Sequence, residues 1–292
     1  MHFSNVANVF VLPALAQAAA LTRVSNYGGT ASSKTEMWVY KPDNVKANPA
    51  LVVVIHSCQS TAQQYFANSK IPWHQGSDAG GYITVWPTSP NSGTCWDVSS
   101  SKSLKRDGGG DSTAIANMIK YAIPQYNINA TRVYVTGGSS GAMMGNVLAA
   151  TYPDLIKAVS VYSGVAAGCF VGQGVAQWNN ACSGGTSTNT QAGWAKIAED
   201  MYPGYNGTRP KMQIWHGSAD STIAPQNYQE ELKQWTGVFG VTMTASESKF
   251  NTPEASYTTS NYGPNVQGIY GQGVGHSVPS HLKVSEAWFS LP

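Results

Sequence analysis

The chain has 292 residues, of which 42% are apolar and 11% charged, and its formal net charge is +2. Such a chain can bury a large core, and α/β folds of this length are often a single domain. The near-neutral charge argues against binding to nucleic acid or to acidic membranes, whereas a polar but weakly charged surface suits extracellular work on neutral polymers.

The N-terminal segment is typical of a secretory signal peptide. Residues 9–21 are nearly all apolar or small and are too short to span a membrane, and small-residue cleavage patterns occur at residues 14–16 and 16–18. We therefore predict a signal peptide over residues 1–20 and a secreted domain over 21–292. The segment carries no Lys or Arg before its apolar run, so an apolar first helix of the domain is the alternative.

Short β-rich runs alternate with helical segments along the rest of the chain. Leu51–Ile55 is continuously apolar, as a parallel strand buried on both faces requires. Asp111 is expected to cap a helix over about 112–121, a second helix follows Gly141, and Pro225 opens a third that ends near Trp235. Strands separated by helices predict a mainly parallel sheet. The expected strands are Met37–Tyr40, Leu51–Ile55, Tyr82–Trp86, Arg132–Thr136, Ala158–Tyr162 and Met212–Trp215.

Four cysteines and two sequons agree with secretion. Four cysteines allow three pairings, and we favour Cys58–Cys95 and Cys169–Cys182 because each pair flanks one short region of the expected loops. Closing either loop stabilises the fold by roughly 3 kcal/mol. The sequons predict glycosylation at Asn129 and Asn206. The chain contains no CxxC spacing, no Walker lysine and no dinucleotide fingerprint, so we expect no metal and no cofactor.

The strongest motif is Gly-x-Ser-x-Gly at residues 137–141, directly after an expected strand and before an expected helix. This context predicts a nucleophile elbow, in which a serine occupies a strained turn and its neighbours must be small. Ser139 is then the nucleophile, flanked by Gly137 and Gly141. Ser140 is the competing choice, but its frame places Ala142 at the closing position.

A serine nucleophile needs a histidine to accept its proton, and a carboxylate to orient that histidine. His276 lies in a glycine-rich loop near the C-terminus and is the expected base. His216 ends a strand and is expected to be a structural, hydrogen-bonding residue, whereas His281 is expected at the surface or at a helix cap.

Asp220 follows an expected strand in the segment His216-Gly217-Ser218-Ala219-Asp220, which is where an α/β-hydrolase fold places its acid. Glu230 and Glu231 lie in an expected helix and are predicted to form part of its solvated face.

The oxyanion hole requires two backbone N–H groups, one from the residue after the nucleophile and one from the loop after an early strand. Ser140 and Cys58 are the predicted donors.

Taken together, these segments resemble the fungal acetylxylan esterases of carbohydrate esterase family 1, which are related to feruloyl esterases and polyhydroxybutyrate depolymerases. The resemblance covers nearly all of the chain from about Val24 onward. It implies the α/β-hydrolase fold and the roles given above for Ser139, Asp220, His276, Cys58 and Ser140. The segments that carry it are His56-Ser57-Cys58, Cys95-Trp96, Gly137 to Met144, His216 to Asp220 and Gly275 to Pro279.

The resemblance also implies that Trp178, in the long loop after Ala158–Tyr162, shapes the substrate cleft. The expected protein is a secreted, monomeric esterase that removes acetyl groups from xylan and works without an attached cellulose-binding module. A feruloyl esterase is the alternative within the same chemistry. A carbohydrate-binding protein that has lost catalysis is the alternative from a different class, and the intact set of catalytic residues argues against it.

Overall fold

The apolar run Leu51–Ile55 forms strand β3 at the centre of the fold, and all five of its residues are buried in the computed structural model. Successive side chains of a strand point to opposite faces of the sheet. Leu51, Val53 and Ile55 accordingly pack into one hydrophobic core, while Val52 and Val54 pack into another on the opposite face. The sheet is therefore covered on both sides at this strand.

The structure describes residues 19–28 and 34–292, and within them ten strands form one sheet in the order β1-β2-β4-β3-β5-β6-β7-β10-β9-β8. The strands from β4 to β10 in this order are parallel, and antiparallel strands flank them at both edges. Their bounds are β1 Thr22–Val24, β2 Glu36–Tyr40, β3 Leu51–Ile55, β4 Ile83–Thr88, β5 Val133–Gly138, β6 Ala158–Tyr162, β7 Lys211–Gly217, β8 Glu247–Phe250, β9 Tyr257–Asn261 and β10 Val266–Gly271.

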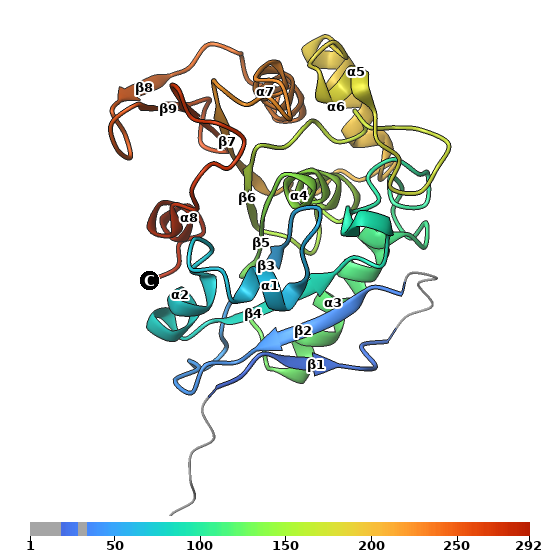
Figure 1. Cartoon of the computed structure of the whole chain (residues 1–292), viewed down its shortest axis with the longest axis vertical. Coiled ribbons are helices and arrows are strands. Elements are labelled where there is room, and N and C mark those ends of the chain that lie inside the picture. The colour runs from blue at the N-terminus through green and yellow to red at the C-terminus, as the bar shows by residue number, and fades with distance from the viewer. Residues whose placement is uncertain (1–18, 29–33) are drawn as a thin grey trace, which may run out of the picture.

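Helices cover both faces of the sheet (Figure 1). Helices α3, α4, α6 and α7 supply residues to the larger core, whereas α1, α2 and α8 border the smaller one. This is the α/β-hydrolase fold expected from the sequence. The helix bounds are α1 Ala62–Phe66, α2 Trp73–Gly80, α3 Asp111–Gln125, α4 Ser140–Thr151, α5 Asn180–Ser183, α6 Gln191–Asp200, α7 Gln226–Val238 and α8 Leu282–Trp288.

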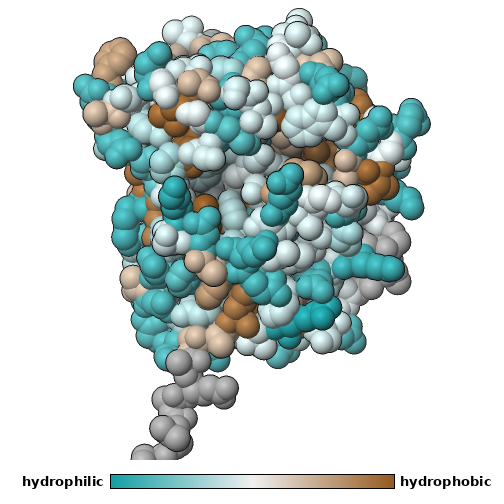
Figure 2. Space-filling view, in the orientation of Figure 1, coloured by the Kyte–Doolittle hydropathy of each residue, from teal (hydrophilic) through white to brown (hydrophobic). Residues whose placement is uncertain are grey.

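The surface in the view of Figure 2 is mostly polar or of intermediate hydropathy, with hydrophobic residues only in small separate patches. This follows from the composition, because few side chains are charged and the surface must be built from uncharged polar residues.

Several details differ from the sequence prediction. Asp111 is not an N-cap: Gly110 caps α3, and the Asp111 carboxylate instead accepts hydrogen bonds from Asn91 Nδ2 and the Asp97 N–H. Glu230 and Glu231 are not solvated, because both are fully buried in α7. The long loop expected after β6 contains the short helix α5 and leads into α6.

The predicted signal peptide over residues 1–20 falls almost entirely outside the described residues. Among the residues that the structure does describe, no helix is both long enough and apolar enough to span a bilayer.

Candidate active site

Ser139 occupies a strained turn between β5 and α4, with φ 53° and ψ −120°. Such a conformation is costly for a residue with a side chain and persists where the surroundings enforce it. Gly137 and Gly141 allow it, because a Cβ on Gly137 would lie 2.7 Å from the Gly141 backbone and one on Gly141 would collide with the Ile55 carbonyl. The glycines of the motif are therefore required by the close approach of the elbow to the end of β3.

The two serines of the motif have different partners, which separates the competing assignments. Ser139 Oγ lies 2.9 Å from His276 Nε2. Ser140 is buried as the first residue of α4, and its Oγ accepts a hydrogen bond of 2.7 Å from the Trp96 N–H. Of the two hydroxyls, only that of Ser139 contacts a base.

His276 lies on the loop between β10 and α8, and that loop is tied to the sheet at its backbone. Ser163, which follows β6, donates its hydroxyl to the His276 carbonyl at 2.8 Å. Ser163 is itself buried and has a positive φ of 55°, and its N–H donates to the Trp215 carbonyl at 2.8 Å. This connection holds the imidazole against Ser139 and was not predicted from the sequence.

Asp220 completes the chain of hydrogen bonds from the turn after β7. Its Oδ2 lies 2.8 Å from His276 Nδ1, and its Oδ1 accepts the N–H groups of Thr222 and Ile223 at 2.9 and 2.8 Å. Burial favours the protonated acid, but hydrogen bonds from His216, His276 and the Ile223 amide outweigh burial and hold the pKa of Asp220 well below its usual range. Asp220 is therefore ionised and able to stabilise a protonated His276.

Two fully buried side chains, His216 and Glu231, lie behind Asp220. His216 Nε2 faces two acceptors, the Ile223 carbonyl at 3.0 Å and Asp220 Oδ2 at 3.3 Å, so this nitrogen must carry the hydrogen. Among the described residues, neither His216 Nδ1 nor Glu231 Oε2 has a hydrogen-bond partner. Burial raises the pKa of Glu231 to about 7, although His216 and a hydrogen bond from Asn146 oppose the rise. His216 is thus the structural histidine expected, and it contacts the acid directly.

The loop that would supply the first oxyanion donor is clamped to the elbow. A disulfide joins Cys58, after β3, to Cys95, and the other pairs Cys169 with Cys182, so both pairings are those favoured from the sequence. Trp96, next to Cys95, donates its Nε1–H to the His56 carbonyl at 2.8 Å and its N–H to Ser140 Oγ. Cys95 and Trp96 therefore tie the Cys58 loop to Ser140.

His56 supports the same loop as a neutral residue. Its Nδ1–H donates to the Ser57 carbonyl at 2.7 Å, and its Nε2 accepts the Ser89 N–H at 3.1 Å. Burial lowers the pKa of His56 to about 4, although the bond to Ser57 opposes the change. Since both ring nitrogens are already engaged, His56 serves to shape the loop rather than to transfer protons.

Trp178 lies on a loop that is anchored beside this region. Its indole is 48% exposed and packs edge-on against Phe170 at 5.1 Å between ring centroids. The loop is held by the buried Asp97, whose Oδ1 accepts the Ala176 N–H at 3.0 Å. Asp97 is two residues from Cys95, so an exposed aromatic surface is fixed close in the fold to the clamped loop.

A small cavity lies beneath the elbow. It has a volume of about 30 Å³, and its lining includes Gly137, Gly138, Tyr65 and Val278. Its lining includes none of Ser139, Asp220 and His276.

The described residues contain no cluster of His, Cys, Asp and Glu side chains that could hold a metal ion.

The two sequon asparagines differ in exposure and bonding. Asn129 is half-buried and its Oδ1 accepts hydrogen bonds from the N–H and hydroxyl of Thr131, whereas Asn206 is exposed.

Several known proteins are similar to this chain over most of its length. The family described as esterase PHB depolymerase matches residues 37–251. Acetylxylan esterase A of Talaromyces purpureogenus is 52% identical over 277 residues, which cover 94% of this chain and 72% of that protein. Acetylxylan esterase A of Aspergillus ficuum is 49% identical over 275 residues, which cover 93% of this chain and 90% of that protein.

The solved structure of an acetyl xylan esterase from Aspergillus awamori superposes with a TM-score of 0.91 at 46% identity, covering 93% of this chain and 99% of that one. The S-formylglutathione hydrolase FrmB of Staphylococcus aureus superposes with a TM-score of 0.57 at 13% identity, covering 94% of this chain and 99% of that one. At 13% identity, the second likeness shows only that the two proteins share a fold.

Proposed function

The chain belongs to the esterase family of PHB depolymerases and, on that premise, we propose that it is an acetylxylan esterase that removes acetyl groups from xylan. The observation that carries the proposal is the continuous hydrogen-bonded chain from Ser139 through His276 to Asp220. Relatives named acetylxylan esterase, at about half identity over most of the chain, supply the substrate class.

The reaction follows from the hydrogen-bond roles. Ser139 Oγ bonds to the ester carbonyl carbon while its proton moves to His276 Nε2, and Asp220 stabilises the imidazolium at Nδ1. The bond from that carbon to the sugar oxygen then breaks, and the sugar oxygen takes the proton from His276. Water attacks the acetyl-enzyme, with His276 again accepting the proton, and acetate leaves as Ser139 recovers its hydroxyl.

The N–H groups of Ser140 and Cys58 are the proposed oxyanion donors. Ser140 begins α4, where a helix leaves its first N–H groups without internal partners and favours negative charge. Cys58 is held near the elbow by its disulfide and by the contacts of Trp96. Each such donor typically accounts for about 10²–10³ in rate.

The likeness at half identity is to enzymes named for acetylxylan, which supports acetate over ferulate. Trp178 is proposed to contact the sugar chain, because its exposed indole offers a flat apolar face.

We also propose that the enzyme is secreted and works as a monomer. Two disulfides suit an oxidising compartment. The three catalytic residues and both oxyanion candidates come from one chain, so the site needs no second subunit. Secretion is tested by N-terminal sequencing of protein from the culture medium, which is expected to begin near residue 21.

The substrate is tested with arabinoxylan that carries both acetyl and feruloyl esters, by measuring both acids released by the wild type and by Ser139→Ala. Acetate in excess, lost in the variant, is the expected result. Ferulate in excess would show that feruloyl esters are the preferred substrate, with the mechanism unchanged. Acid release that survives in Ser139→Ala would overturn the mechanism.

A further inference from the structure

A second pocket lies at the opposite end of the parallel strands from Ser139. It has a volume of about 650 Å³ and is formed by the segment between α6 and β7, the end of α7 and the residue before β10. Arg209 precedes β7, whereas His216 and Gly217 end that strand beside the catalytic residues. Seven residues of strand span roughly 20 Å, so this pocket is separate from the catalytic centre.

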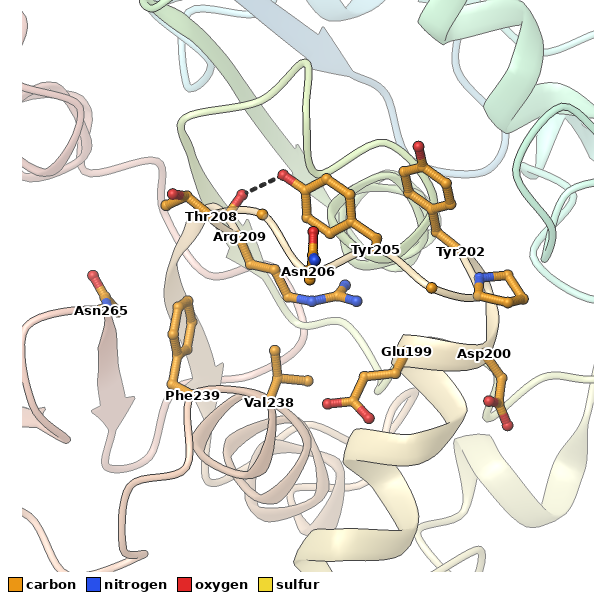
Figure 3. A pocket seen from close by; sticks show the side chains of 13 residues that line it. Glu199, Asp200, Tyr202, Tyr205, Asn206, Thr208, Arg209, Val238, Phe239 and Asn265 are labelled. Carbon is orange, nitrogen blue, oxygen red and sulfur yellow. Dashed lines mark hydrogen bonds between the residues drawn. The ribbon is translucent and has the colours of Figure 1, made fainter.

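The most unusual feature of the pocket is the guanidinium of Arg209. Figure 3 shows it extending into the space between Tyr205 and Asn206 on one side and Glu199 and Val238 on the other. Its Nη1 is buried and, among the described residues, has no hydrogen-bond partner. Burial lowers the pKa of Arg209, although the nearby charge of Glu199 opposes the change. A buried donor without a partner is costly and marks a position where a ligand acceptor would be favourable.

The walls of the pocket are aromatic. The Arg209 guanidinium lies 5.5 Å from the centre of the Tyr205 ring, and that ring is stacked on Tyr202 at 5.0 Å between centroids. The Tyr205 hydroxyl donates to the Thr208 carbonyl at 2.7 Å, which fixes the ring, and Phe239 lines the other side. The hydroxyl bond and the stacking hold the Tyr205 ring in place, so this aromatic surface is present before any ligand arrives.

The polar groups supply both donors and acceptors with almost no net charge. Arg209 donates, Glu199 accepts, and the amide of Asn265 can do both. Asp200 is neutralised by Lys196 at 2.8 Å, so Arg209 and Glu199 are the opposing charges that remain. A phosphate or another strong anion would be repelled by Glu199, and a purely apolar ligand would leave Arg209 unpaired.

A pyranose unit has the matching chemistry, because its C–H face packs on aromatic rings while its hydroxyls donate and accept hydrogen bonds. We propose that this pocket is a second, non-catalytic site that binds sugar units of a neutral polysaccharide. This inference rests on the proposed function, because the polysaccharide bound in this pocket is the same polymer that the catalytic site deacetylates. Binding at two points raises the effective concentration of the polymer at the catalytic site.

The test measures the affinity of the full chain for soluble acetylated xylan by electrophoresis in gels that contain it. Ser139→Ala is present throughout so that the polymer is not altered, and each protein is tested both with its N-glycans and after their removal, because Asn206 lies at the pocket. Arg209→Met and Tyr205→Ala are each compared with Arg23→Met, which removes an arginine on β1 at the far edge of the sheet.

Arg209→Met and Tyr205→Ala are each expected to weaken binding about tenfold, as the loss of a charged hydrogen bond or a stacking surface does, while Arg23→Met leaves it unchanged. With Ser139 restored, all three variants are expected to hydrolyse 4-nitrophenyl acetate at the wild-type rate. Unchanged affinity in both pocket variants would overturn the second site. So would a loss of 4-nitrophenyl acetate turnover in these variants as large as their loss of affinity for the polymer. Failure of the proposed function would appear differently, as no acetate released from the polymer by the wild type.

Discussion

Replacing Asp220 by Asn tests the proposed orientation of His276, because Asn keeps the shape of the side chain and removes its charge. The N–H groups of Thr222 and Ile223 both point at Oδ1, so the oxygen of the new amide is held at that position. Its NH₂ group then faces His276 Nδ1, where the carboxylate now accepts. His276 is forced to carry its proton on Nε2 and cannot accept one from Ser139.

The wrong tautomer is expected to lower kcat by about 10³–10⁴-fold, which corresponds to about 4–5.5 kcal/mol of transition-state stabilisation. The assay is initial-rate hydrolysis of 4-nitrophenyl acetate, with circular dichroism to confirm folding. Asp200→Asn is the matched control, since that carboxylate is exposed and pairs with Lys196. A folded Asp220→Asn enzyme that keeps more than a tenth of the wild-type kcat would refute the assignment of Asp220.

Three further predictions concern groups around the triad. Ser140→Ala removes the acceptor of the buried Trp96 N–H, so unfolding measurements are expected to show a loss of about 1–3 kcal/mol while kcat stays within about tenfold; a near-complete loss of kcat would implicate Ser140 as nucleophile. Glu231 binds its proton more tightly when folded, so wild-type stability declines as pH rises from about 4.5 to about 7. Glu231→Gln cannot lose a proton, and its Tm relative to wild type is expected to rise across that range; a constant difference contradicts the buried acid. Replacing Cys58 and Cys95 together by Ser is expected to cost about 3–4 kcal/mol in urea unfolding and to lower kcat, because the Cys58 loop loses its clamp; unchanged kcat would show that the proposed oxyanion donor does not depend on this disulfide.

Much of the fold could be predicted because local pattern and tertiary position agree in the central strands. Leu51–Ile55 and Ala158–Tyr162 have the bounds expected from their apolar runs, since burial on both faces requires continuous apolar sequence. Strands β8 and β9 lack that signal. The four residues of β8 are exposed, and β9 is largely polar, so their pairing depends on the neighbouring strand.

The candidate site was predictable where one residue and its neighbours carry the chemistry, as at the elbow of Ser139. Contacts between distant segments were not predictable. Ser163 supports the His276 carbonyl across 113 residues of sequence, and nothing local to Ser163 indicates that role. Glu231 looked like part of a solvated helix face because charged residues usually are, yet it lies buried where Asn146 donates to it. Whether such a helical glutamate is exposed or buried depends on which elements pack together, and the local sequence does not show that.

The central claim is that Ser139 is the residue that becomes acylated. The most direct measurement is to treat the protein with a fluorophosphonate, which labels activated serines covalently, and to locate the label by peptide mass spectrometry. A single label on Ser139, absent in Ser139→Ala and retained in Ser140→Ala, is the predicted result. A label on Ser140 or on a serine outside the elbow, or a folded and active protein that takes no label, would contradict the account.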